Sequence, residues 1–189
     1  MDERRPQRRR IRLALQIYAE VGAICTVTIA VKGRIPVFGD PAIADAAIEV
    51  LRRHAAATEV PVYAWCTMPD HIHLVLGASP ICDIVTFVGR FKNLVQREAW
   101  RLGVTGAFWQ ASFWDHFLRK DEQLERVIEY VLNNPVRSGL VARWCDYRFS
   151  GSLVYDVVDP GGGQAPALRV RPVSDRRTVR DGRPVSHGG

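Results

Sequence analysis

Apolar residues along this chain recur with two periods, one typical of strands and one typical of helices. Three short runs rich in β-branched and other apolar residues predict strands, and the first and third of them end at Gly33 and Gly77. A run rich in aromatic residues predicts a fourth strand. The predicted strands lie within residues 23–33, 60–68, 69–77 and 108–119.

Three other segments carry apolar residues at helical spacing. The first has Asp40 at the position of an N-cap and Pro41 at the first helical position. The last is expected to be capped by Asp121 and ended by Pro135, which cannot donate a helical hydrogen bond. The predicted helices span residues 40–57, 82–103 and 121–134.

The order of these elements, β-α-β-β-α-β followed by a helix, predicts the fold class. It is the order of an α+β sandwich of the ferredoxin-like or RNA-recognition-motif-like kind. We expect a central antiparallel sheet with helices on one face. The other face would be free for a functional site.

Two histidines interrupt the apolar run of the third predicted strand, "HIHLVLG". Successive side chains of a strand point to opposite faces, so His71, His73 and Val75 share one face, opposite Ile72 and its neighbours. Two such histidines can simply be half-buried and hydrogen-bonded. They can also belong to a phosphoesterase with two His-x-Ser/Thr motifs, or bind a metal together with a ligand from elsewhere in the chain.

The remaining histidines weaken one of these alternatives. His54, His116 and His187 supply no second motif of the phosphoesterase kind. On a helical wheel, the last predicted helix has a stripe of aliphatic residues, and Tyr130 and Asn134 lie together on its flank, off that stripe. A surface tyrosine near a helix end is the simpler interpretation of this flank. A site for chemistry is the other.

Composition and charge bound the protein class. The chain has 189 residues, of which 47% are hydrophobic and 24% charged, as in ordinary globular proteins. Its net charge of +6 is carried by its ends, because residues 1–12 and 160–189 each hold six arginines and only two acidic residues. We therefore predict a basic disordered arm, a folded domain and a disordered Arg/Gly/Pro-rich tail. These three parts span residues 1–12, 13–155 and 156–189.

The sequence shows no signal peptide and no membrane span, and its cysteines lack metal-ligand spacing. The longest apolar neighbourhood, at residues 11–31, is interrupted by Arg12, Gln16 and Glu20. We interpret the four cysteines as small buried thiols of a reducing compartment. They are Cys25, Cys66, Cys82 and Cys145.

Several motifs in order make the sequence resemble a known family. "MPDHIHLVL", then "FWQASFWDHFLRKDEQLERVIEYVLNNPVRSGLV" and "CDYRFSGS" resemble the REP-associated tyrosine transposases, which belong to the single-tyrosine HUH endonucleases. The resemblance covers residues 23–155. It implies the HUH endonuclease fold, with His71 and His73 as metal ligands, Asn134 as a third ligand and Tyr130 as the nucleophile. Asp70 stands where the family usually has Asn.

The resemblance also implies a reaction. A divalent metal, Mg²⁺ or Mn²⁺, would serve the cleavage and rejoining of single-stranded DNA at hairpin-associated sites through a 5′-phosphotyrosine. Two alternatives stay open: a non-catalytic module that binds DNA or RNA hairpins, and a rolling-circle-type replication nickase. The protein would act as a monomer or homodimer on DNA in a bacterial cytoplasm, away from membranes.

Basic and aromatic side chains are the candidate DNA contacts. Some aromatic residues of 109–117 could stack on bases, although alternation buries about half of them. The role of Asp115 and His116 in "FWDH" does not follow from the sequence. For the basic residues of the predicted helices, a solvated helix face is the alternative. The candidates for phosphate binding are Arg34, Arg90, Lys92, Arg97, Arg119 and Arg137.

Overall fold

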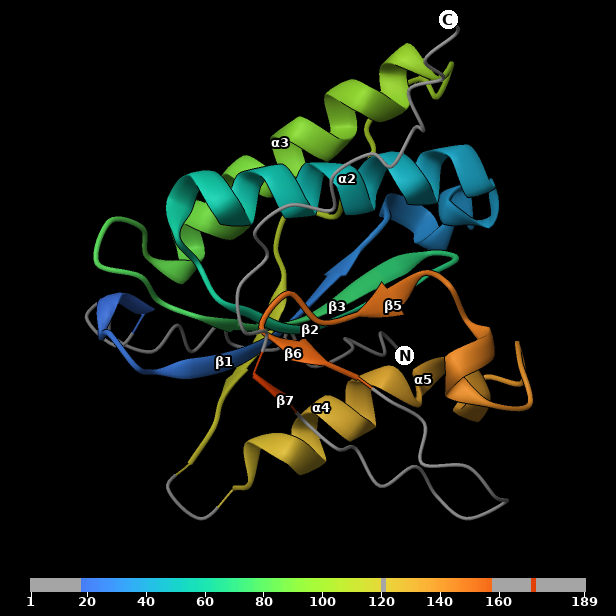
Figure 1. The fold of residues 1–189 in the computed structure, drawn as a ribbon. Coiled ribbons are helices and arrows are strands. Elements are labelled where there is room, and N and C mark those ends of the chain that lie inside the picture. Colours follow the sequence, from blue (N-terminus) through green and yellow to red (C-terminus); the bar gives the residue numbers. More distant parts are fainter. Residues whose placement is uncertain (1–17, 120–121, 158–170, 173–189) are drawn as a thin grey trace, which may run out of the picture.

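The computed structural model describes residues 18–119, 122–157 and 171–172. Their centre is a five-stranded antiparallel sheet with the strand order β4-β1-β3-β2-β5 (Figure 1). The predicted α+β sandwich is therefore confirmed, with one further strand at the edge next to β2. The strands are β1 (Ile24–Ala30), β2 (Val62–Met68), β3 (His71–Gly77), β4 (Trp114–Phe117) and β5 (Ser150–Gly151).

Two long helices cover one face of the sheet (Figure 1). Helix α2 (Pro41–Thr58) begins where predicted, because the Asp40 carboxylate accepts a hydrogen bond from the Ala42 amide at 2.8 Å. Helix α3 (Ile84–Arg101) is capped in the same way by Asp83, 2.8 Å from the Thr86 amide. Their apolar stripes meet Ile72, Leu74 and Leu76 of β3 in the larger hydrophobic core.

The sequence predicts that the second face of the sheet is free. This prediction is wrong, because the second face carries its own helix. Helix α4 (Leu124–Leu132) packs against β2 and β3, and the short helix α5 (Asn134–Arg137) follows it (Figure 1). Ile128, Val131 and Leu132 pack there with Val75 and Cys66 in a smaller core. The correction has a physical reason: the aliphatic stripe of α4 needs an apolar partner, and β2 and β3 offer one on both faces.

The start of α4 also differs from the prediction. The helix begins at Leu124 with Gln123 at the N-cap, and the Gln123 side chain makes no capping hydrogen bond among the described residues. Asp121 lies outside the described residues, so the cap expected from it stays a prediction. Pro135 ends the helix as predicted, because α4 stops at Leu132 and Pro135 lies in the first turn of α5.

Short elements complete the described chain. Strand β6 (Tyr155–Asp156) pairs with β7 (Arg171–Pro172), so three residues of the predicted disordered tail, Asp156, Arg171 and Pro172, are paired in strands. The predicted arm at 1–12 and residues 158–170 and 173–189 of the predicted tail lie outside the described residues. Three single-turn helices connect the larger elements: η1 (Lys32–Arg34), η2 (Val37–Gly39) and η3 (Trp144–Asp146).

Two further predictions concern the burial of the cysteines and the absence of a membrane-spanning helix. Cys25, Cys66 and Cys82 are buried free thiols, whereas the prediction of a buried thiol is wrong for Cys145, which is exposed in η3. Among the described residues, no helix combines the length and the apolar character that a membrane crossing requires.

Candidate active site

The two histidines of β3 turn their rings toward each other. Strand alternation puts His71 and His73 on the face of α4, while Ile72 and Leu74 enter the larger core. Their Nε2 atoms lie 3.0 Å apart, and the ring planes meet at 84°. The sequence prediction that both imidazoles share one face is confirmed.

Each histidine is held in place through its other ring nitrogen. Nδ1 of His73 is hydrogen-bonded to Thr28 Oγ1 on the neighbouring strand at 2.9 Å. Nδ1 of His71 donates to the carboxylate of Asp70. An ionised carboxylate only accepts hydrogen bonds, so the lone pair of His71 is on Nε2, the atom that faces His73.

Asp70 is itself fixed by a cation. Its second oxygen forms an ion pair with Arg34 Nε at 3.0 Å. Pro69 and Asp70 are the two turn residues of the β2–β3 hairpin, and their carbonyls accept the amides of Phe38 and Val31 at 2.9 Å. The turn before His71 is thus tied to the loop after β1.

The backbone of Arg34 adopts a conformation that is rare for side-chain-bearing residues. Its φ of 58° lies in the left-handed region. Such a conformation costs free energy and persists where surrounding contacts fix it. Here the ion pair with Asp70 and the hydrogen bond from the Arg34 amide to the Val31 carbonyl at 3.1 Å supply those contacts.

The environment keeps His73 in its neutral form. Burial lowers the pKa of His73 to about 4, and the nearby basic side chains of His71, Arg34 and Arg137 act in the same direction, while Asp70 opposes them. A neutral imidazole has the free lone pair that metal coordination requires. His73 is therefore available as a ligand over the whole physiological pH range.

The histidine pair fits a divalent cation. Two ligand atoms about 2.1 Å from a cation and at right angles to each other lie about 3.0 Å apart, which is the Nε2–Nε2 distance here. No cluster of three or more His, Cys, Asp or Glu side chains that could hold a metal occurs in the described part of the chain. The remaining ligands would be an amide, water and the substrate, and imidazoles favour Mn²⁺ over Mg²⁺.

Tyr130 lies on the flank of α4 that the helical wheel predicted. Ile128, Val131 and Leu132 are buried, while 54% of Tyr130 is exposed. The guanidinium carbon of Arg137 lies 4.4 Å from the centroid of the Tyr130 ring. The aliphatic stripe thus anchors the helix and leaves the phenol accessible beside a positive charge.

Asn134 follows Tyr130 by one helical turn, at the junction between α4 and α5. Its amide nitrogen donates to the carbonyls of Tyr130 and Val131 at 3.0 and 3.1 Å. These bonds close the last turn of α4 and do not use the amide oxygen of Asn134, which is the atom suited to a cation.

A cavity joins His73 to Tyr130. Its volume is about 500 Å³, and it lies between α4 and the face formed by β3, β1 and β4. His73 lies on its sheet wall and Tyr130 on its helix wall. The other lining residues used below are Thr26, Thr28, Trp114, His116, Glu122 and Arg126.

Three of the six basic candidates lie near this site. Arg34 and Arg137 are close enough to His73 to lower its pKa, although Arg34 is paired with Asp70. Arg119 follows β4 and is exposed, and its amide donates to Glu122 at 2.8 Å. The guanidinium groups of these three arginines place positive charge near the cavity.

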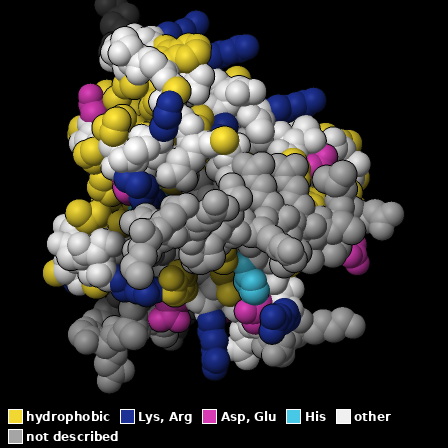
Figure 2. Space-filling model, turned by 180° about the vertical axis from the view of Figure 1, so that it is seen from behind, with side chains coloured by type: hydrophobic (Ala, Val, Ile, Leu, Met, Phe, Trp, Pro, Cys, Tyr) yellow, Lys and Arg dark blue, Asp and Glu magenta, His cyan; other side chains and the backbone are white. Residues whose placement is uncertain are grey.

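The other three lie on α3, across the sheet from the histidines. Arg90 and Arg97 are exposed on that helix, while Lys92 donates to the Gln110 carbonyl at 2.7 Å and is half-buried. Figure 2 shows Lys and Arg side chains scattered over one face of the molecule rather than gathered in a single patch. The structure does not bring these three residues to the cavity.

Asp115 and His116 of "FWDH", for which the sequence gives no role, lie on opposite faces of the sheet. Asp115 accepts a hydrogen bond from the buried Tyr18 hydroxyl at 2.7 Å, on the face of the larger core. His116 faces the cavity, and its Nε2 lies 3.1 Å from both carboxylate oxygens of Glu122. Sequence reasoning missed Thr28 and Glu122, because neither stands near the histidines or Tyr130 in the chain.

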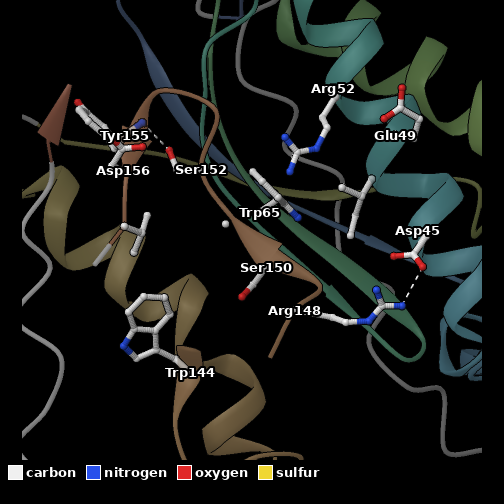
Figure 3. A pocket seen from close by; sticks show the side chains of 13 residues that line it. Asp45, Glu49, Arg52, Trp65, Trp144, Arg148, Ser150, Ser152, Tyr155 and Asp156 are labelled. Atoms are coloured by element: carbon white, nitrogen blue, oxygen red, sulfur yellow. Dashed lines mark hydrogen bonds and ion pairs between the residues drawn. The ribbon is translucent and has the colours of Figure 1, made fainter. Parts of the chain in front are cut away.

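A second cavity lies at the opposite edge of the sheet, between α2, β5 and the residues after η3 (Figure 3). Its charged side chains are largely engaged with other residues: Arg148 pairs with Asp45 at 2.8 Å, and Arg52 lies over the Trp65 ring. None of the predicted catalytic or metal-binding residues lines it. It is therefore separate from the candidate site.

Comparison with known proteins identifies relatives with transposase names. The chain is 25% identical over 122 residues to a putative REP-associated tyrosine transposase of Haemophilus influenzae, covering 57% of this chain and 69% of that protein. It is 27% identical over 89 residues to the REP-associated tyrosine transposase of Escherichia coli, covering 47% of this chain and 52% of that protein. The resemblance stated from the motifs is confirmed.

A solved structure and a family model agree with this result. The structure of a REP-associated tyrosine transposase bound to a REP hairpin covers 70% of this chain and 78% of its own, with 22% identity and a TM-score of 0.56, which shows a shared fold. The model of the family "Transposase IS200 like" matches residues 22–134, from the start of β1 through α4 to Asn134. The chain belongs to the IS200-like transposase family.

Proposed function

We propose that this protein is a metal-dependent transposase that cleaves and rejoins single-stranded DNA at hairpin-associated sites through a 5′-phosphotyrosine. The observation that carries the proposal is the cavity that His73 and Tyr130 line from opposite sides. A phosphate in this cavity would meet a cation site on the sheet and a phenol on the helix. Membership of the transposase family supports a strand-transfer reaction.

Five residues would hold or orient the cation. His71 and His73 would hold a divalent cation through their converging Nε2 atoms, with the amide oxygen of Asn134 as a further ligand. Such a cation, when bound, withdraws charge from the scissile phosphate and orients it. Asp70 and Thr28 keep the two imidazoles in the orientation that binding needs.

Tyr130 is the proposed nucleophile. Its Oη attacks phosphorus, an Oη–P bond forms, the bond from phosphorus to the 3′-oxygen breaks, and the departing strand takes up a proton to end in a 3′-hydroxyl. The phenol loses its proton, and Arg137 over the ring favours the negative charge that develops on the oxygen. The phosphotyrosine conserves the phosphodiester bond, so attack by a 3′-hydroxyl rejoins strands without another energy source.

The substrate part of the proposal rests on several supports. The relative of known structure was bound to a REP hairpin, and this chain shares its fold. Arg34, Arg119 and Arg137 around the cavity suit a polyanion. Action as a monomer or homodimer, and in a bacterial cytoplasm, stay predictions.

The test is a search for the covalent intermediate. Wild-type protein is incubated with labelled single-stranded hairpins that have unpaired flanks, in Mg²⁺ or Mn²⁺, and resolved on a denaturing gel. We expect a metal-dependent protein–DNA band that is absent in Tyr130→Phe and in His71→Ala/His73→Ala, and retained in Tyr155→Phe, a tyrosine of the second cavity. Tight binding without any covalent band would instead support the non-catalytic hairpin-binding module.

A further inference from the structure

We infer that Trp114 and His116 form a stacking site for one unpaired nucleobase next to the scissile phosphate. The inference rests on the proposed function, because it assigns the occupant of the same cavity. It goes further by naming the chemical group that enters and the residues that receive it. Four observations carry it: exposure, ring geometry, bracing and distance from the histidines.

Trp114 is unusual among the aromatic residues of its segment. Its neighbours Phe113 and Phe117 pack against the larger core, and Trp109 is buried. Trp114 has 57% of its surface exposed although it lies in β4, the edge strand of the sheet. A large exposed ring beside a cavity loses hydrophobic stabilisation unless a ligand covers it.

The geometry of the two rings suits stacking. The ring planes of Trp114 and His116 differ by only 16°, and their centroids lie 6.2 Å apart, so the two rings are stacked nearly parallel and together form an aromatic surface. Both residues line the cavity of about 500 Å³, which falls within the range of roughly 300–1,000 Å³ typical of small-ligand sites. Every nucleobase has a flat face that gains free energy on an aromatic ring.

The surface is fixed before any ligand arrives. Nε2 of His116 lies 3.1 Å from both oxygens of Glu122, and Glu122 also accepts the Arg119 amide at 2.8 Å. Thr26 Oγ1 donates to the His116 carbonyl at 3.2 Å from the next strand. Preorganisation of this kind lowers the conformational entropy that a ligand must overcome.

The sheet register places this surface one nucleotide from the histidines. Trp114 pairs with Thr28 of β1, and Thr28 pairs with His73 of β3, so the three residues form one row across the sheet. Two strand spacings separate Trp114 from His73, about 10 Å. When the scissile phosphate lies between His73 and Tyr130, an adjacent base reaches the Trp114 ring while its edge faces Arg126 across the cavity.

The experiment compares how DNA affinity changes when the Trp114 ring is removed from the protein and when one base is removed from the DNA. Binding is measured with full-length Tyr130→Phe protein, so that no cleavage intervenes. The probe is the tightest-binding member of the panel of single-stranded hairpins with unpaired flanks. Each unpaired nucleotide is replaced in turn by an abasic one, and affinities are measured for Trp114→Ala, Trp114→Phe and the control Trp100→Ala. Trp100 is likewise exposed, at 49%, but lies on α3 across the sheet.

We expect one position where the abasic substitution weakens binding about tenfold. At that position Trp114→Ala should show the same loss with the intact base and no further loss with the abasic one. Trp114→Phe should restore most of the affinity, and Trp100→Ala should behave like the parent. A 2-aminopurine at that position should be quenched on binding the parent protein and stay bright with Trp114→Ala.

Two outcomes distinguish this inference from the proposed function. If wild type forms the covalent band but no abasic position depends on Trp114, the stacking site is wrong and the transposase mechanism stands. If Trp114-dependent stacking is found while wild type forms no covalent band, the stacking site stands and the catalytic proposal fails. Equal effects of Trp114→Ala and Trp100→Ala would also overturn the inference.

Discussion

The guanidinium carbon of Arg137 lies 4.4 Å from the centre of the Tyr130 ring, so a cation covers one face of the proposed nucleophile. The contact joins α5 to α4 across the junction at Asn133. It restrains the phenol, whose helix position leaves it exposed. It also brings positive charge to where a phosphate would bind beside His73.

Loss of this cation should slow the covalent step. We expect Arg137→Ala to form the protein–DNA adduct about fivefold more slowly, because a contact of this kind stabilises by roughly 1 kcal/mol. Arg137→Lys should recover part of the rate, since it keeps the charge but not the flat guanidinium. Adduct formation is followed over time by quenched denaturing gels. Arg148→Ala is the matched control, because Arg148 covers Phe149 at 4.3 Å near the second cavity. An equal rate in Arg137→Ala and Arg148→Ala would remove the proposed role.

Asp70 should determine how tightly a cation is held. Asp70→Asn restores the residue usual in the resembled family, but it replaces a charged acceptor of the His71 Nδ1 proton by a neutral one. We expect Mn²⁺ affinity, titrated by electron paramagnetic resonance, to fall about tenfold or more. Arg34→Ala, which removes only the ion pair with Asp70, should have a smaller effect. Unchanged Mn²⁺ binding in Asp70→Asn, together with its loss in His71→Ala, would contradict this prediction.

The packing of α4 should govern stability as well as the position of Tyr130. Ile128 is 1% exposed in the smaller core, so Ile128→Ala should lower the free energy of unfolding by about 2–5 kcal/mol. Ile128→Val should cost about 1 kcal/mol. Urea denaturation measures both, with Ile81→Ala as the control, because Ile81 is 65% exposed. A loss at Ile128 no larger than at Ile81 would show that α4 does not pack on the sheet as described.

Burial of His73 predicts a pH dependence of stability in the metal-free protein. The pKa of His73 is lowered to about 4 by burial, so between pH about 6.5 and 4 the unfolded chain binds a proton that the native state does not. The free energy of unfolding should therefore fall as pH drops through this window, by at most about 3 kcal/mol from this residue. His73→Gln should show a shallower decline than wild type. His54, whose pKa burial also lowers, is common to both proteins and cancels in the comparison. Parallel curves would contradict the assignment.

The sequence predicts the parts of this site that depend on local periodicity. Strand alternation placed His71 and His73 on one face, and the helical wheel placed Tyr130 off the aliphatic stripe of α4. The long helices are also local features, because Asp40 and Asp83 cap them within three residues. Each of these predictions needs only the geometry of one element.

Contacts between elements could not be predicted in this way. The Arg34–Asp70 pair requires the left-handed conformation at Arg34 and the docking of that loop on the hairpin turn. The row from Trp114 through Thr28 to His73 depends on the register of three strands that are far apart in the chain. The covered second face follows from how α4 docks, which no single-element pattern specifies. The separate roles of Asp115 and His116 depend on the same long-range register.

The central claim is that Tyr130 becomes covalently attached to the 5′ end of cleaved DNA. Wild-type protein is incubated with Mn²⁺ and a hairpin strand labelled at its 3′ end, and the label is located on a denaturing gel. The protein is then digested with nuclease and trypsin and analysed by mass spectrometry. The tryptic peptide of residues 127–137 contains Tyr130 and no other tyrosine. The proposed mechanism predicts a nucleotide 5′-phosphate on this peptide and a 3′ label that stays with the protein. A label that stays with the protein only when placed at the 5′ end, or an adduct on another residue, would contradict it.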